Sequence, residues 1–317
     1  MPRAEDVLTM QAAPLDYFTH SAGPATRPTL WLDWGYAAIC LAVCVIIGGL
    51  LVWAILRRRN FGPEVGRRDH SGLNWITIGA GISTVVLLVM AVAAFIGLRQ
   101  VTDPPKPAQL VITVTGYDWW WKVEYEGQAG GFETANEIHI PTGVPVRLKL
   151  KSADVIHAFW VPALAGKTQM IPGVLNTQWL QADKPGIYYG QCTQFCGLQH
   201  AHMAFEVIAD TPADFARWRK AQTQPAIATG EGLAVFVDQC GGCHAVRGTS
   251  VSGGHGPDLT HLMSRRHIAA GLLPTTPDNI MAWVSHAQTL KPGVRMPDFA
   301  LTPGDATALR AYLTELR

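Results

Sequence analysis

The sequence is poor in charged residues and in cysteine, and it has no excess of positive charge. Only 15% of its 317 residues are charged and 48% are hydrophobic, whereas ordinary soluble domains carry roughly 25% charged residues. A formal net charge of +1 provides no concentrated basic face for phosphates, which argues against a nucleic-acid partner. The few cysteines form three close pairs, at 40/44, 192/196 and 240/243. Such pairs are typical of metal or cofactor attachment, so we expect a membrane protein with redox chemistry.

Two long uncharged runs, Gly35 to Leu56 and Ser71 to Leu98, are each long enough to cross a lipid bilayer as a helix. The segment between them is rich in arginine, at positions 57–59, 67 and 68. The positive-inside rule places this short loop in the cytoplasm, so both flanks of the hairpin lie on the outer side. The first 30 residues lack the pattern of a cleavable signal, and we expect the first helix itself to direct export.

After the proline-rich stretch 103–107 the pattern changes twice. Short β-rich runs predict a sandwich or barrel; they are Gln109–Thr115, Trp119–Tyr125, Glu137–Ile140, Val144–Leu150 and Ala204–Ala209. Thr-Pro pairs that begin at Thr211, Thr276 and Thr302 predict helix starts, with threonine as N-cap and proline in the first turn. The C-terminal part is therefore expected to be mainly helical.

The predicted fold is that of a multi-domain membrane protein. We expect an outward-facing N-terminal tail at 1–34, a transmembrane helical hairpin at 35–100, an all-β domain at 101–212, a helical start and linker at 213–229, and an all-α domain at 230–317.

One group of residues forms a soft ligand set that suits copper. Two cysteines four residues apart can bridge a pair of copper ions, two histidines can each bind one metal, and a methionine can serve as a weak axial ligand. The residues are His157, Cys192, Cys196, His200 and Met203. A structural zinc site is the alternative, but zinc knuckles use tighter cysteine spacing and no thioether. The set therefore favours a dinuclear copper centre.

With Gln194, these residues resemble the CuA motif of cytochrome c oxidase subunit II, and the resemblance covers residues 30–210. It implies a cupredoxin-like β-barrel in which Gln194 ligates copper through its backbone carbonyl. The family usually has Glu at that position, where the side chain helps to bind magnesium, and the neutral Gln does not support a shared magnesium site. Gly72 likewise stands where the family often has a Glu at the mouth of a proton pathway, so protons need another entry.

The aromatic segment 116–125 is part of the same resemblance. Three consecutive tryptophans, at 119–121, cannot all face one core from a strand, so at least one should be exposed. The resemblance implies that electrons from cytochrome c enter the copper site through Trp119; the alternative is an ordinary core tryptophan. Tyr117 and Trp121 are expected to be packing residues.

The sequence Cys240-Gly-Gly-Cys243-His244 is the signature of covalent c-type haem attachment, and residues 232–239 before it predict a helix. A redox-active disulfide also uses Cys-x-x-Cys, but the following histidine favours haem. Met296, in a loop flanked by proline, is our predicted sixth ligand, because His/Met ligation is typical of cytochromes c and its Met-Pro sequence resembles that of class I cytochromes c. The alternatives are Met263, Met281, or a second histidine from positions 255, 261, 267 and 286.

The expected function is that of an electron-input subunit of a haem–copper terminal oxidase. Electrons from a periplasmic donor, a soluble cytochrome c or another redox protein, would pass through haem c and CuA to subunit I, which reduces oxygen to water while protons are pumped. Subunits I and III are the expected partners, in a bacterial inner membrane with both redox domains in the periplasm. The linker 222–229 would set the effective concentration of the fused cytochrome.

Two alternatives change the role of the chain. It could be the CuA subunit of a nitric oxide reductase, or a membrane-anchored copper-delivery module, which would scarcely need a covalent haem. Quinol oxidase subunits share the fold implied by the resemblance but lack the copper ligands.

Overall fold

The computed structural model describes residues 20–57, 71–127, 131–226 and 230–317. These residues form two compact units. One is Arg27–Asp103, and the other combines the residues up to Thr26 with Pro104–Arg317. The arginine-rich loop predicted to be cytoplasmic lies outside the described residues except for Arg57.

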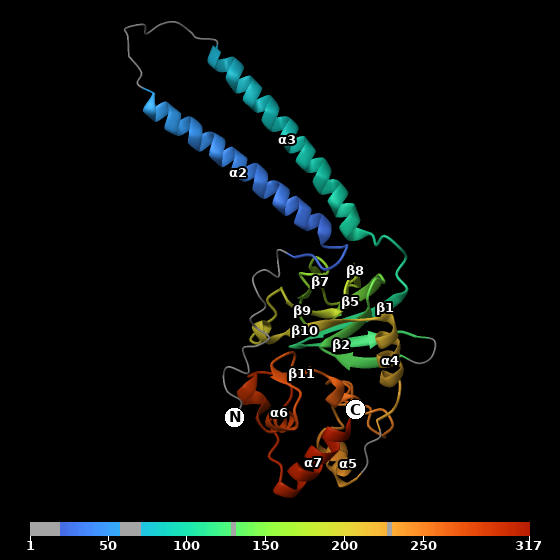
Figure 1. Ribbon diagram of the computed structural model, residues 1–317. Coiled ribbons are helices and arrows are strands. Elements are labelled where there is room, and N and C mark those ends of the chain that lie inside the picture. Colours follow the sequence, from blue (N-terminus) through green and yellow to red (C-terminus); the bar gives the residue numbers. More distant parts are fainter. Residues whose placement is uncertain (1–19, 58–70, 128–130, 227–229) are drawn as a thin grey trace. The chain divides into compact units, whose positions relative to one another are not determined.

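The first unit consists of two long apolar helices, α2 (Arg27–Leu56) and α3 (Ser71–Thr102), which are long and apolar enough to cross a membrane. The start of α2 and the end of α3 lie close together (Figure 1). In this region Gly97 of α3 faces Leu32 of α2. A Cβ at position 97 would lie 3.0 Å from the Leu32 side chain, so the glycine permits this close approach. Helix α2 begins eight residues before the uncharged run at Gly35, because Arg27 and Asp33 are accommodated in its first turns.

The β-rich part of the second unit contains two five-stranded sheets. One has the order β3-β2-β1-β5-β8 and the other β4-β10-β9-β6-β7. The strands are β1 (Leu110–Tyr117), β2 (Trp120–Tyr125), β3 (Phe132–Ala135), β4 (Glu137–Pro141), β5 (Val146–Ser152), β6 (His157–Trp160), β7 (Thr168–Met170), β8 (Asn176–Leu180), β9 (Gly186–Cys192) and β10 (Ala204–Asp210). Parallel pairing of β1 with β5 and of β10 with β4 makes both sheets mixed.

The core lies between these two sheets. Strands β2 and β5 alternate buried and solvent-facing residues, as expected for strands with one face on a core. Trp121 of β2 is completely buried. Its ring packs edge-on against Phe159 of β6 and Phe205 of β10, with ring centroids 5.9 and 5.0 Å away. Burial of such large aromatic side chains dominates the stability of a core.

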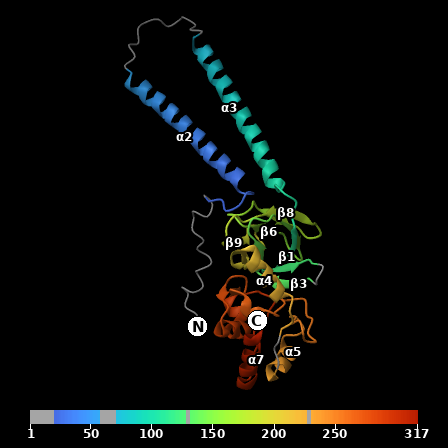
Figure 2. The same ribbon diagram turned by 45° about the vertical axis from the view of Figure 1, so that its right-hand side comes forward.

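The C-terminal part contains α4 (Pro212–Gln222), α5 (Glu231–Gln239), η3 (Leu262–Ser264), a small hairpin of β11 (His267–Ile268) and β12 (Leu273–Pro274), α6 (Pro277–Leu290) and α7 (Pro303–Glu315). Helices α5 and α7 lie side by side in both views (Figures 1 and 2). They cross closely because Gly232 of α5 has no side chain; a Cβ there would lie 2.1 Å from the carbonyl oxygen of Ala308.

The predicted fold class is confirmed: two apolar helices, a cupredoxin-like β domain and a helical C-terminal domain. The three predicted helix starts are also confirmed, since Thr211, Thr276 and Thr302 each accept a hydrogen bond from the backbone N–H three residues later. In the β domain, five strands that the sequence analysis did not identify, β3 and β6–β9, are short or carry mixed polar residues. His157 is the first residue of β6.

The expectation of an exposed tryptophan is wrong. Trp121 faces the core, while Trp119 and Trp120 are both half-buried. Trp120 stacks on Tyr117 at a ring-centroid distance of 4.8 Å, and both Trp119 and Trp120 line a cavity of the C-terminal domain. The C-terminal domain covers Trp119 and Trp120, which would face solvent if the β domain stood alone.

Candidate metal and haem centres

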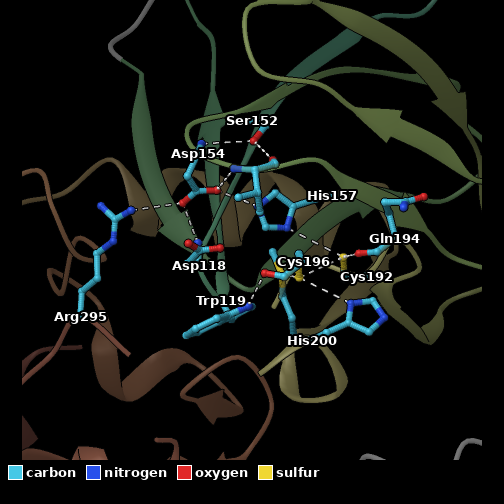
Figure 3. A network of polar contacts seen from close by, with 12 residues as sticks. Asp118, Trp119, Ser152, Asp154, His157, Cys192, Gln194, Cys196, His200 and Arg295 are labelled. Atoms are coloured by element: carbon cyan, nitrogen blue, oxygen red, sulfur yellow. Dashed lines mark hydrogen bonds and ion pairs between the residues drawn. The ribbon is translucent and has the colours of Figure 1, made fainter. Parts of the chain in front are cut away.

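Two cysteines and a histidine form a buried cluster at one end of the β domain. The ligand atoms of His157, Cys192 and Cys196 all lie within 4.8 Å of one another. The two sulfurs are 3.8 Å apart, and Cys192 Sγ lies 3.9 Å from Nδ1 of His157. These side chains come from the start of β6, the end of β9 and the loop that follows β9, and they converge on one point (Figure 3).

The other three predicted ligands surround the same sulfurs. Nδ1 of His200 lies 3.5 Å from Cys196 Sγ, and Sδ of Met203 lies 3.8 Å from it. The backbone oxygen of Gln194 lies 3.2 Å from Cys192 Sγ, while its side chain points away from the cluster (Figure 3). The structure thus brings all six predicted copper ligands together, with soft sulfur and imidazole donors that suit copper.

Two residues that the sequence analysis missed hold His157 in place. Asp154 Oδ1 lies 2.9 Å from Nε2 of His157, which directs Nδ1 toward the cysteines; a metal-binding histidine is commonly oriented by such a carboxylate. Gly116 of β1 makes room for the ring, because a Cβ there would lie 2.9 Å from Cδ2 of His157. Asp154 lies three residues before His157, a weak signal that the sequence analysis did not use, whereas nothing in the sequence indicates Gly116.

The electrostatics of the cluster favour a thiolate. The hydrogen bond between the two sulfurs lowers the pKa of Cys192 below that of an ordinary thiol and raises the pKa of Cys196. Burial opposes protonation of His157, but its hydrogen bonds with Asp154 and Cys192 raise its pKa to about 9. A thiolate is the form of cysteine that binds metals.

The second centre lies in the C-terminal domain. Cys240, Cys243 and His244 follow α5 directly and line an apolar cavity. Nδ1 of His244 lies 2.8 Å from the carbonyl oxygen of Pro257, so Nδ1 carries the proton and Nε2 remains the available metal ligand. Gly256 permits this orientation, since a Cβ there would lie 2.6 Å from Cε1 of His244. These residues fit a haem attached through both cysteines and ligated by the histidine.

Met296 lies on the wall of the same cavity, in the loop after α6. The side-chain amide of Gln288 donates hydrogen bonds of 2.7 Å to the carbonyl oxygens of Val294 and Met296, which fastens the loop. Of the alternative ligands, His255 and His267 also line the cavity. The remaining alternatives, Met263, Met281, His261 and His286, do not line it.

A buried arginine supplies an independent test of whether a haem fits. Arg265 is 8% exposed and lines the cavity, and no residue in the described part of the chain accepts a hydrogen bond from its Nε. Buried donors are normally satisfied, and a haem carries propionate groups that pair with arginine. The unpaired donor therefore fits a haem in this cavity, although the sequence analysis did not identify Arg265.

Trp119 connects the two centres. Its Nε1 donates a 2.9 Å hydrogen bond to the carbonyl oxygen of Cys196, while its ring lines the cavity of the C-terminal domain. Two glycines lie near the ring: a Cβ on Gly197 would lie 3.0 Å from it, and one on Gly293 would lie 3.7 Å from it. One indole thus contacts both the copper-type loop and the loop that carries Met296.

Comparison with known proteins gives the family. Residues 125–210 match the model of the cytochrome c oxidase subunit II periplasmic domain, and residues 230–317 match that of cytochrome c. Cytochrome c oxidase subunit 2 of Alkalihalophilus pseudofirmus is 33% identical, covering 90% of this chain and 88% of the relative. Quinol oxidase subunit 2 of Bacillus cereus is 32% identical over 61% of this chain and 68% of the relative.

Among solved structures, the periplasmic domain of subunit II of cytochrome oxidase from Bradyrhizobium japonicum is 34% identical, covers 37% of this chain and 96% of that chain, and has a TM-score of 0.36. The two matched domain types imply copper and haem as cofactors, and the two apolar helices indicate a membrane anchor. Similarity along nearly the whole of both chains shows that this protein belongs to the cytochrome c oxidase subunit 2 family, and is therefore an oxidase subunit that associates with the other subunits of the enzyme.

Proposed function

We propose that this chain is the electron-input subunit of a haem–copper terminal oxidase. It accepts electrons from a periplasmic donor in its cytochrome c domain and delivers them, through its copper domain, to subunit I, which reduces oxygen to water with proton pumping. A covalently bound haem c and a dinuclear CuA centre supply the one-electron redox chemistry when bound. The donor is a soluble cytochrome c or a similar redox protein, and subunits I and III are the partners in the membrane.

The contact of Trp119 with both centres is the observation that carries this proposal. Its indole N–H is bonded to the backbone of Cys196 and its ring lines the haem cavity. Electron transfer requires that two redox groups be held close, and a single aromatic side chain spans the protein between these two sites. A copper-delivery module would need no such connection to a haem cavity, so the arrangement supports the electron-transfer role.

Each site residue has a defined role in the proposal. Cys192, Cys196, His157, His200, Met203 and the carbonyl of Gln194 would hold the copper. Cys240 and Cys243 would attach the haem, and His244 and Met296 would ligate its iron. Asp154 orients His157, and Arg265 would pair with a haem propionate.

The proposal also includes the arrangement of the chain in the cell. Residues 1–34 form an outward tail, 35–100 the membrane hairpin, 101–212 the CuA domain, 213–229 a helical start and linker, and 230–317 the cytochrome domain. The membrane is the inner membrane of a bacterium, and both redox domains lie in the periplasm.

Oxygen uptake by the complex purified through this subunit tests the function. With an artificial electron donor, the wild-type complex should consume oxygen rapidly, and His157→Ala should abolish uptake because a copper ligand is lost. His286→Ala, which removes an exposed histidine, is the matched control and should retain uptake. Turnover of nitric oxide without oxygen uptake would instead assign the chain to a nitric oxide reductase.

A further inference from the structure

Lys291, at the C-terminal end of α6, is the most unusual charged residue of the C-terminal domain. It is only 1% exposed, and lysine is almost never fully buried unless its ammonium group is paired. Among the described residues, no carboxylate lies within ion-pair distance of its Nζ. Its partners are neutral backbone groups, and their positions explain why it is buried.

The ammonium group donates three hydrogen bonds to three separate segments. They reach the carbonyl oxygens of Trp119 at 2.9 Å, His202 at 2.7 Å and Ala269 at 2.8 Å. Trp119 lies between β1 and β2, His202 lies in the loop that carries the copper-type ligands, and Ala269 lies in the hairpin turn between β11 and β12. An ammonium group has three N–H donors, and here all three are used.

Further hydrogen bonds cross the boundary between the β domain and the C-terminal domain and fix the relative position of the two surfaces. Gln199 donates a 2.8 Å hydrogen bond to the carbonyl of Pro292, and the backbone N–H of Ala204 donates one of 3.2 Å to the carbonyl of Ala270. Ala269 and Ala270 both adopt left-handed φ angles, 54° and 60°, which are unfavourable for alanine. The turn keeps this conformation while its two carbonyls face Lys291 and Ala204.

Buried charges strengthen this boundary. Glu206 of β10 is 1% exposed, and its Oε2 lies 3.2 Å from Nε of Arg266 in the C-terminal domain. Arg266 also donates its backbone N–H to Glu137 of β4. Complementary charged groups of this kind, here an exposed arginine and a buried glutamate, favour one relative position of two surfaces and penalise others. The contacts therefore describe a specific docked arrangement of the two domains.

We propose that Lys291 is a positioning residue. Its hydrogen bonds hold the cytochrome domain against the turn between β1 and β2, which contains Trp119, and against the loop 193–203, which carries the proposed copper ligands. Electrons then cross a fixed interface, and the cytochrome domain does not swing on its linker to collide with the copper domain. This inference rests on the proposed function. The side chain of Lys291 makes no hydrogen bond to a proposed ligand of either cofactor. The inference adds that Lys291 nevertheless sets the rate of electron transfer, because it fixes the position of the cytochrome domain relative to the copper domain.

The linker residues agree with a fixed arrangement. The carbonyl of Gln222 accepts a 2.6 Å hydrogen bond from Arg247, and the backbone N–H of Ala226 donates one of 2.9 Å to the carbonyl of Arg247. The described part of the predicted linker is thus attached to the cytochrome domain and is not a free tether.

The test uses Lys291→Met in the assembled, cofactor-loaded complex. Methionine has a similar length and no donor, and Lys220→Met, which changes an exposed lysine of α4, is the matched control. The cytochrome haem is reduced by a flash-activated ruthenium complex, and reduction of the copper centre is followed optically. Hydrogen exchange at the Ala204 amide, which bonds across the boundary, reports separation of the domains independently of electron transfer.

We expect Lys291→Met to slow copper reduction by about tenfold or more, since small misplacements of reacting groups have effects of that size, and to accelerate exchange at Ala204. The absorption spectra of both cofactors should be unchanged, and Lys220→Met should behave as wild type. If the methionine variant does not assemble, Lys291→Gln, which keeps two donors, should give a smaller slowing.

Three outcomes would overturn the inference. One is a wild-type transfer rate in Lys291→Met. If Lys291→Met does not assemble, a wild-type rate in Lys291→Gln would have the same meaning. Another is faster exchange at Ala204 without slower transfer, which would make Lys291 a purely structural residue. If the wild-type complex itself transfers no electrons from haem to copper, the proposed function fails, and the inference fails with it.

Discussion

The indole N–H of Trp119 donates a 2.9 Å hydrogen bond to the carbonyl oxygen of Cys196. This bond joins the side chain that lines the haem cavity to the backbone of a copper-type ligand. Gly197 leaves room for the ring, because a Cβ there would lie 3.0 Å from it, so the hydrogen bond and this close approach together set the orientation of the indole.

Trp119→Phe keeps an aromatic ring but removes the donor to Cys196. We expect transfer from haem to copper to slow by about tenfold to 100-fold, because the ring is smaller and no longer anchored. Flash reduction of the haem, with optical detection of copper reduction, measures this rate. Trp218→Phe, in the aromatic cluster beside Tyr125 and Phe132, is the control and should leave the rate unchanged. Equal rates in both variants would remove Trp119 from the path.

Gly116→Ala should reduce the copper content of the purified complex. The new methyl group would lie 2.9 Å from Cδ2 of His157, and relieving such overpacking costs about 1 to 3 kcal/mol. The imidazole must therefore leave the position in which its Nδ1 lies 3.9 Å from Cys192 Sγ. Gly186→Ala is the control, because its methyl group would only make ordinary contacts, at 3.7 Å or more, with Tyr188. Metal analysis of both variants checks the prediction, and undiminished copper in Gly116→Ala would contradict it.

Gln194→Ala should retain full copper content and an unchanged copper spectrum. The atom of Gln194 nearest to Cys192 Sγ is its backbone oxygen, at 3.2 Å, and alanine keeps that oxygen. Cys196→Ser, which replaces a soft sulfur ligand by a hard oxygen, should lose copper. Loss of copper in the alanine variant would show that the side chain of Gln194 is required.

Gly232→Ala should destabilise the cytochrome domain. Its methyl group would lie 2.1 Å from the carbonyl oxygen of Ala308, so α5 and α7 would have to separate, at a cost of about 1 to 3 kcal/mol or more. Gly254→Ala, where the added methyl group meets nothing within 4 Å, is the control. The yield of haem-containing protein and its thermal unfolding distinguish the two; equal melting temperatures would refute the packing argument.

Tyr125→Phe should change the alkaline stability of the protein. The Tyr125 hydroxyl donates to the carbonyl of His139 and accepts from its N–H, and burial raises the pKa of Tyr125 well above its usual value. Unfolded tyrosine ionises near about pH 10 while the folded residue stays protonated, so stability falls as pH rises above about 10. The variant should be less stable at neutral pH by about 1 to 3 kcal/mol.

Thermal unfolding of Tyr125→Phe and wild type on either side of about pH 10 measures this linkage. The melting temperature of the variant should fall less steeply with pH, because one ionising group of the unfolded state is absent. Parallel pH profiles would exclude Tyr125 as a source of the alkaline destabilisation.

Features set by residue type and spacing could be predicted from the sequence. The ligand clusters around Cys192 and Cys240 are examples, because binding a metal or haem requires those residue types at close spacing. The helix start at Thr276 is another, because capping requires a threonine directly before the first turn. Gly116 could not be predicted, because β1 and β6 belong to different sheets and Gly116 reaches His157 only through the tertiary structure. Asp154 lies three residues before His157, but an aspartate near a histidine is too common a pattern to indicate the contact. Lys291 could not either: its partners lie far away in the chain, and a lone lysine after a helix resembles any solvent-exposed one.

Residues of both domains line the cavity, Trp119 and Trp120 from the β domain and Met296 from the C-terminal domain. A ligand stabilises whichever form of a protein it binds, so a haem bound here, as proposed, would favour the arrangement in which both domains line the cavity. Under the proposed function, haem attachment would therefore be thermodynamically linked to the packing of the two domains against each other.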